Sequence, residues 1–164
     1  MRFLLIFWLL VTFTYSCSSL NIKQPQVMNC PSSGICKTEV LENERYILKR
    51  DQFSKSYVEL QQQEGARQLK ILFDQNQDPS IADSPYREEY FLPLTVIENQ
   101  ITAQKSTFKI NLLYGRIGNY RGQDLYHVKD DVLVSIKKQD GKTYLNLTLN
   151  QPELKLNELT VLLD

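Results

Sequence analysis

The sequence predicts an all-β fold, either an antiparallel β-sandwich or a flattened barrel of about seven to nine short strands with little helix. Two observations lead to this prediction. Apolar and polar residues alternate in several short runs, most clearly in residues 108–114, and this is the period of a half-buried strand. Turn residues separate the runs, and the clearest of them is Asp140-Gly141, the pair that a two-residue hairpin turn prefers.

Four strands are predicted in the first half of the body. Residues 37–42 and 45–49 each alternate loosely between apolar and polar side chains, and Asn43-Glu44 separates them. The next two strands are predicted to form a hairpin around a two-residue turn at Glu64-Gly65. Its register places Leu60 opposite Leu69, Val58 opposite Ile71, Ser56 opposite Phe73 and Glu59 opposite Lys70.

Residues 74–85 have no apolar rhythm and are predicted to form a loop. The acidic and amide residues at the start of this loop match the first three ligand positions of a calcium-binding loop. Pro79 and Pro85, however, stand where such a loop needs a glycine and a bidentate glutamate. A solvated turn is therefore predicted in place of a metal site.

Strands are predicted again at residues 86–94 and 108–114, and Pro93 favours an edge position or a bulge for the first of them. The Asp140-Gly141 turn then joins the last clear hairpin. One or two further strands follow in residues 154–163. The predicted register of the hairpin places Ile136 opposite Leu145, Val134 opposite Leu147 and Val132 opposite Leu149.

The N-terminus has the pattern of a secretory signal peptide, because Arg2 precedes an almost unbroken apolar run that ends before Ser16-Cys17. The run is shorter than the roughly 20 apolar residues that cross a bilayer as a helix. We therefore expect residues 1–16 to be removed, residues 17–29 to form a tether, and residues 30–164 to form one β domain.

The chain has three cysteines, and an odd number in an exported protein needs an explanation. Cys30 and Cys36 flank a short segment in which Pro31 and Gly34 let the backbone turn, so these two can form a disulfide. Their spacing is not that of a zinc site, and we expect neither a metal nor another cofactor. If Cys30 and Cys36 pair with each other, Cys17 is left without a partner cysteine.

The junction before Cys17 resembles the lipobox of bacterial lipoproteins, in which the cysteine becomes the lipid-modified N-terminus. Thr14 and Tyr15 differ from the residues that are usual at those positions. Ordinary signal cleavage near Ser16 or Ser19, with Cys17 left unmodified, is the alternative.

The pattern Cys30-Pro31, Gly34, Cys36 and residues 39–43 is similar to the start of some small uncharacterised Gram-negative lipoproteins. The resemblance covers under a third of the chain. It implies an exported domain that a lipid on Cys17 holds on a bilayer of the cell envelope. Serine after the cysteine favours the outer membrane, and a periplasmic or secreted protein is the alternative.

Residues 114–126 are the strongest candidate in the body for binding a ligand. They combine the residue types that recognition loops use for rigid aromatic area, planar donors and a flexible backbone. A long connection whose tyrosines pack on their own sheet is the alternative. The candidate residues are Tyr114, Arg116, Tyr120, Arg121 and Tyr126.

No catalytic motif is found in the sequence. His127, the single histidine, is predicted to be a surface residue. The two acids of Glu88-Glu89, like those of Asp130-Asp131, are adjacent in sequence and therefore point to opposite faces of a strand. Neither pair can act as a catalytic dyad. Basic and acidic residues balance at 19 each, so there is no basic field to attract nucleic acid.

We therefore expect a non-catalytic interaction or structural module of the cell envelope, with a protein or glycan partner that the sequence does not name. The alternative is an exported domain that binds a glycan or a peptide through residues 114–126. An enzyme would need carboxylates or His127 to converge in a cleft.

Overall fold

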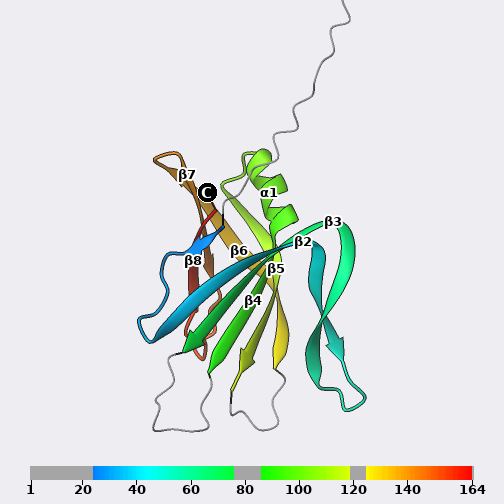
Figure 1. The fold of residues 1–164 in the computed structure, drawn as a ribbon. Coiled ribbons are helices and arrows are strands. Elements are labelled where there is room, and N and C mark those ends of the chain that lie inside the picture. Colours follow the sequence, from blue (N-terminus) through cyan, green and yellow to red (C-terminus); the bar gives the residue numbers. More distant parts are fainter. Residues whose placement is uncertain (1–23, 76–85, 119–124, 164) are drawn as a thin grey trace, which may run out of the picture.

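The computed structural model describes residues 24–75, 86–118 and 125–163. Their strands form one antiparallel sheet in the order β1-β8-β7-β6-β5-β4-β3-β2, which curls into a nearly closed barrel (Figure 1). The predicted all-β fold is confirmed. In chain order the elements are β1 (Gln26–Val27), β2 (Gly34–Arg50), β3 (Ser56–Gln75), β4 (Arg87–Pro93), α1 (Leu94–Thr102), β5 (Thr107–Ile117), β6 (Tyr126–Gln139), β7 (Lys142–Thr148) and β8 (Glu158–Leu162).

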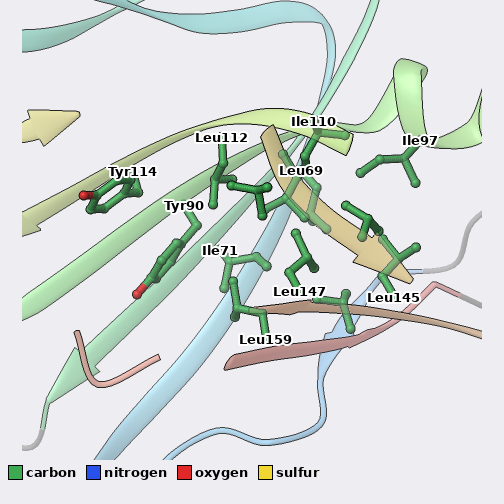
Figure 2. Close-up of a cluster of buried hydrophobic side chains, with 14 of the residues drawn as sticks. Leu69, Ile71, Tyr90, Ile97, Ile110, Leu112, Tyr114, Leu145, Leu147 and Leu159 are labelled. Carbon is green, nitrogen blue, oxygen red and sulfur yellow. The ribbon is translucent and has the colours of Figure 1, made fainter. Parts of the chain in front are cut away.

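The inside of the barrel is a packed apolar core. Alternate residues of each strand point inward, as the period of a strand requires, and the alternation predicted for residues 108–114 is confirmed because Ile110, Leu112 and Tyr114 lie in this core. Figure 2 shows side chains from β3, β4 and β5 facing those of β7 and β8. Labelled examples are Leu69, Ile71, Tyr90 and Leu112 on one side and Leu145, Leu147 and Leu159 on the other.

The barrel closes where β1 approaches β2. Gln26 and Val27 pair with the end of β8, and the Thr38 hydroxyl of β2 donates a hydrogen bond to the Pro25 carbonyl. The Gln24 side-chain amide donates to the Thr38 carbonyl at 3.3 Å. Residues of the expected tether therefore belong to the folded sheet.

The hairpin between β6 and β7 follows the prediction. Asp140 and Gly141 have φ of 53° and 75°, the positive values that a type I′ turn requires. In the described ladder of β6 and β7, the predicted pairs Val134 with Leu147 and Ile136 with Leu145 are formed, but the ladder ends at the first of these and does not include Val132 with Leu149.

The predicted turn at Glu64-Gly65 is wrong. β2 and β3 are two long strands that pair from Gly34 and Gln75 as far as Arg50 and Ser56, so the turn between them lies at residues 51–55. Gly65 has a φ of 74°, and its N–H donates to Oδ1 of Asn43 at 2.9 Å beside a shift of the register. Glycine at positive φ serves a β-bulge as well as a turn, and here it bends the hairpin.

Beyond this bulge, residues 44–62 form a two-stranded extension, which we call the arm. Figure 1 shows the arm, which is the C-terminal part of β2 and the N-terminal part of β3, leaving the barrel. It packs on the outer face of the sheet, where the Ser56 hydroxyl donates to the Tyr126 carbonyl at 2.7 Å and accepts from the Tyr126 N–H at 3.2 Å. The outer cluster joins Phe91, Leu113 and Tyr126 of the barrel to Tyr46, Leu48 and Val58 of the arm.

The helix α1 starts directly after Pro93. Only its first residue, Leu94, belongs to the predicted strand of residues 86–94, and the sequence predicted no element for residues 95–102. Its buried side chains are Leu94, Ile97 and Ile101, a spacing that places them on one helix face. They join the interior core. β4 lies between β3 and β5, so the predicted edge position of Pro93 is wrong; this proline ends the strand where the helix begins.

Candidate functional site

The two body cysteines form the predicted disulfide. The sulfur atoms of Cys30 and Cys36 are 2.07 Å apart, and the Cα atoms are separated by 5.8 Å. Both residues pack against the interior core, so the bond fastens the segment before β2 to the barrel. Cys17, the expected lipidation site, lies outside the described residues.

The structure separates the candidate residues of the 114–126 stretch. Tyr114 lies inside the barrel, where its ring stacks on Tyr90 at 6.5 Å and burial raises its pKa. Tyr126 lies on the outer face under the arm. These two tyrosines therefore do not form one binding face. Arg116 is half-buried in β5, and Tyr120 and Arg121 lie outside the described residues.

A groove with a volume of about 410 Å³ lies where the arm leaves the barrel. It forms because the ladder between β3 and β4 ends at Gln68 and Pro93, while β3 continues into the arm and the chain after Pro93 turns away into α1. A volume of this size suits a small ligand.

The floor of the groove is apolar and its rim is polar. Phe91 and Leu113 are buried in the floor, and the Tyr46 ring lies 4.8 Å from the Phe91 ring. Arg45 and Asn111 are exposed at the rim. Among the described residues, no ion pair involves Arg45. Its guanidinium is therefore available to an anionic group of a ligand.

Arg67 fixes one wall of the groove. Its Nε donates to both carboxylate oxygens of Glu42 at 3.0 Å, and its guanidinium also pairs with Glu98 of α1. The hydrogen bond to Glu42 is the main cause that raises the pKa of Arg67. The Arg67 N–H donates to Oγ1 of Thr95 at 2.7 Å. The helix and the bulged hairpin are thus held in one arrangement.

A polar network lies beside the groove on the same outer face. Nζ of Lys70 is 3.6 Å from Glu89 and lies over the rings of Tyr46, at 5.1 Å, and Phe91, at 5.8 Å. The Tyr126 hydroxyl donates to Glu89 at 2.8 Å. Burial, and then the hydrogen bond to Glu89, raise the pKa of Tyr126. This tyrosine therefore remains a hydrogen-bond donor to a higher pH than an ordinary tyrosine.

The neighbouring carboxylate, Glu88, is fully buried inside the barrel. It accepts hydrogen bonds from the hydroxyls of Tyr86 and Tyr90 and from the backbone N–H groups of Lys155 and Leu156. Burial is the largest cause, ahead of the Glu88 charge, that raises the pKa of Tyr90 far above its usual range. Glu88 therefore fastens the segment before β8, a role that sequence reasoning missed.

The Glu88-Glu89 pair and the histidine are placed as the sequence predicted. Glu88 faces inward and Glu89 outward, as predicted from their adjacency in a strand. His127 is exposed, and Asp131 is 3.6 Å from Lys109 on the surface. Across residues 24–75, 86–118 and 125–163, no three His, Cys, Asp or Glu side chains cluster as metal ligands would.

In the same described ranges, no helix is both long and apolar enough to span a membrane. Comparisons of this chain with protein-family models, with curated proteins and with solved structures give no match.

Proposed function

We propose that this chain is an exported β domain held on a membrane of the cell envelope by a lipid on Cys17, and that it acts by binding or by structural support and not by catalysis. The observation that carries the proposal is the bond between Cys30 and Cys36. It suits an oxidising compartment and leaves Cys17, at the end of a signal-like leader, as the remaining cysteine.

Two features of the carboxylates support a non-catalytic role. Glu88 accepts hydrogen bonds from four donors, and two of them are backbone N–H groups. Glu89 is occupied by Tyr126 and Lys70. A general base needs a free position within hydrogen-bond reach of a substrate proton, and these two acids do not offer one.

Mass spectrometry of the mature N-terminus tests the attachment. The expected result is a diacylated or triacylated Cys17 as the first residue, with the membrane fraction containing the protein. A Cys17→Ala variant is expected to remain in the soluble fraction or to keep its leader. An unmodified N-terminus elsewhere in the wild-type protein would contradict the attachment and leave a periplasmic or secreted domain.

Ligand binding is a second candidate function, and the groove at the bulge favours it. The apolar floor and the exposed Arg45 guanidinium fit a small aromatic or aliphatic carboxylate, with its apolar part on Phe91 and its charge at the rim. This location replaces the face predicted for residues 114–126, because Tyr114 and Tyr126 lie on opposite sides of the sheet.

Benzoate and octanoate can serve as probes in an NMR titration of the groove. We expect the signals of Tyr46 and Phe91 to shift, and Arg45→Gln to weaken binding about tenfold through loss of a charged hydrogen bond. Arg50→Gln, on the same strand but outside the groove, is the matched control and should leave the affinity unchanged. Equal effects of the two variants would reject a specific site.

A further inference from the structure

The tip of the arm exposes an aromatic side chain to solvent. Phe53 lies in the turn between β2 and β3 and is 73% exposed, the largest value among the large hydrophobic residues that the structure describes. Tyr57, two residues into β3, is 41% exposed. An isolated exposed apolar residue is common, but here two exposed aromatic residues lie near the end of one projecting hairpin.

The turn that carries Phe53 is well defined. Oδ1 of Asp51 accepts from the N–H groups of Phe53 at 2.8 Å and Lys55 at 2.9 Å. The Asp51 N–H donates to the Lys55 carbonyl, and the Ser54 N–H to the Asp51 carbonyl, both at 3.0 Å. Phe53 is thus presented on an ordered turn, which lowers the entropy cost of inserting it into a partner.

Three cations surround the aromatic tip. Lys49, Arg50 and Lys55 are exposed, and within the described ranges none of them forms an ion pair. The single acid of the turn, Asp51, directs its carboxylate at the backbone N–H groups of the turn. The tip therefore combines positive charge that has no partner in the described chain with exposed aromatic area.

We propose that the tip of the arm docks on the surface of an anionic lipid bilayer. Aromatic side chains prefer the membrane interface, where an apolar ring meets the polar headgroups. Lysine and arginine near such a surface are attracted by anionic lipids, and each adds to the binding. Phe53 enters the interface, Tyr57 lies at headgroup level, and Lys49, Arg50 and Lys55 contact the phosphates.

The turn between β6 and β7 provides a control within the same molecule. It has the same charges, with Lys137, Lys138 and Lys142 around Asp140, but Gly141 stands at its apex in place of an aromatic residue. Figure 1 shows this turn and the tip of the arm at opposite ends of the molecule. A bilayer that contacts one of them does not contact the other.

The test uses residues 18–164, which retain the whole described body but lack the leader and Cys17, so that the result does not depend on the proposed lipid anchor. Binding is measured by co-sedimentation with phosphatidylcholine vesicles, with and without about 30% phosphatidylglycerol. We expect binding only to the anionic vesicles, and a marked decrease at high salt because the attraction is screened.

Replacing Lys49, Arg50 and Lys55 together by Gln is expected to weaken this binding about 100-fold, and Phe53→Ser about tenfold. The same replacement of Lys137, Lys138 and Lys142 should change it less than about threefold. Circular dichroism checks that each variant is folded. Absence of vesicle binding, which would point to a protein partner for the tip, or equal losses at the two turns, would overturn the proposal.

Discussion

Glu88 and Glu89 are adjacent in β4, yet they fasten different parts of the molecule. Glu88 is completely buried and accepts two of its hydrogen bonds from the backbone of the segment before β8. Glu89 faces outward and is held by the side chains of Tyr126 and Lys70 next to the arm. Backbone donors cannot move away without unfolding, whereas side chains can rotate. We therefore expect the inner carboxylate to stabilise the whole barrel and the outer one to stabilise the contact with the arm.

The largest expected effect is the loss of the inner carboxylate. Glu88→Ala removes the acceptor of two backbone N–H groups. It leaves the hydroxyls of Tyr86 and Tyr90 only their longer hydrogen bonds, both 3.3 Å, to the carbonyls of Glu153 and Leu156. We expect the free energy of unfolding to fall by about 3–5 kcal/mol, as for a broken buried network. Urea unfolding followed by circular dichroism measures this. Glu59→Ala, at an exposed position of β3, is the control and should stay within about 0.5 kcal/mol of wild type; a similar value for Glu88→Ala would reject the role of this residue.

The second largest effect on stability is expected from loss of the disulfide between Cys30 and Cys36. Replacing Cys30 and Cys36 by Ser opens a short loop that packs on the interior core, and the chain-entropy model gives a loss of about 2 kcal/mol. Reduction of the wild-type protein should cause the same loss in urea unfolding and should not affect the double variant. If the reductant destabilised both proteins equally, its effect would not arise from this disulfide.

A matched pair of tyrosine variants compares the two faces directly. Tyr90→Phe removes a hydroxyl that donates to Glu88, and Tyr126→Phe removes one that donates to Glu89. We expect losses of about 2 kcal/mol for Tyr90 and about 1 kcal/mol for Tyr126, because Tyr90 is completely buried whereas Tyr126 is 9% exposed.

Hydrogen exchange locates these two losses. Tyr126→Phe should raise exchange mainly at the arm, for example at Leu48 and Val58, while Tyr90→Phe should raise it throughout the barrel. The same exchange pattern in both variants would mean that the arm and the barrel unfold as one unit, and that the distinction between the faces is wrong.

The sequence was informative where structure is local. The hairpin of β6 and β7 was predicted in register because its turn residues and its alternating apolar residues lie within one short stretch. The β2–β3 hairpin was not, since a glycine at positive φ fits a bulge as well as a turn, and the strand pairing that decides between them joins residues as distant as Gly34 and Gln75.

The candidate sites depend even more on distant contacts. Glu88 meets Lys155, which is 67 positions away in the sequence, and no local pattern indicates this. The groove combines Arg45 of β2, Phe91 of β4 and Val96 of α1, and α1 itself was missed because Tyr90, Leu92 and Leu94 continue the alternation of a strand. The disulfide was predictable because both cysteines belong to one short turn.

The smallest effect is expected from pH, and it again involves one tyrosine on each face. Burial raises the pKa of both Tyr90 and Tyr126 in the folded protein, with a further contribution from the adjacent glutamates. A raised folded-state pKa means that the folded protein holds the proton more tightly than the unfolded chain. The stabilisation is therefore fully present below a pH of about 10, which is the pKa of tyrosine in the unfolded chain, and it is lost as the pH rises above this value.

At a pH near 10.5 we expect the free energy of unfolding, measured with urea, to fall by roughly 1 kcal/mol per tyrosine. Tyr126→Phe should reduce the slope of stability against pH in this range, as should Tyr90→Phe. An unchanged slope in Tyr126→Phe would show that the outer tyrosine titrates as it does in the unfolded chain, and that only the inner face excludes water.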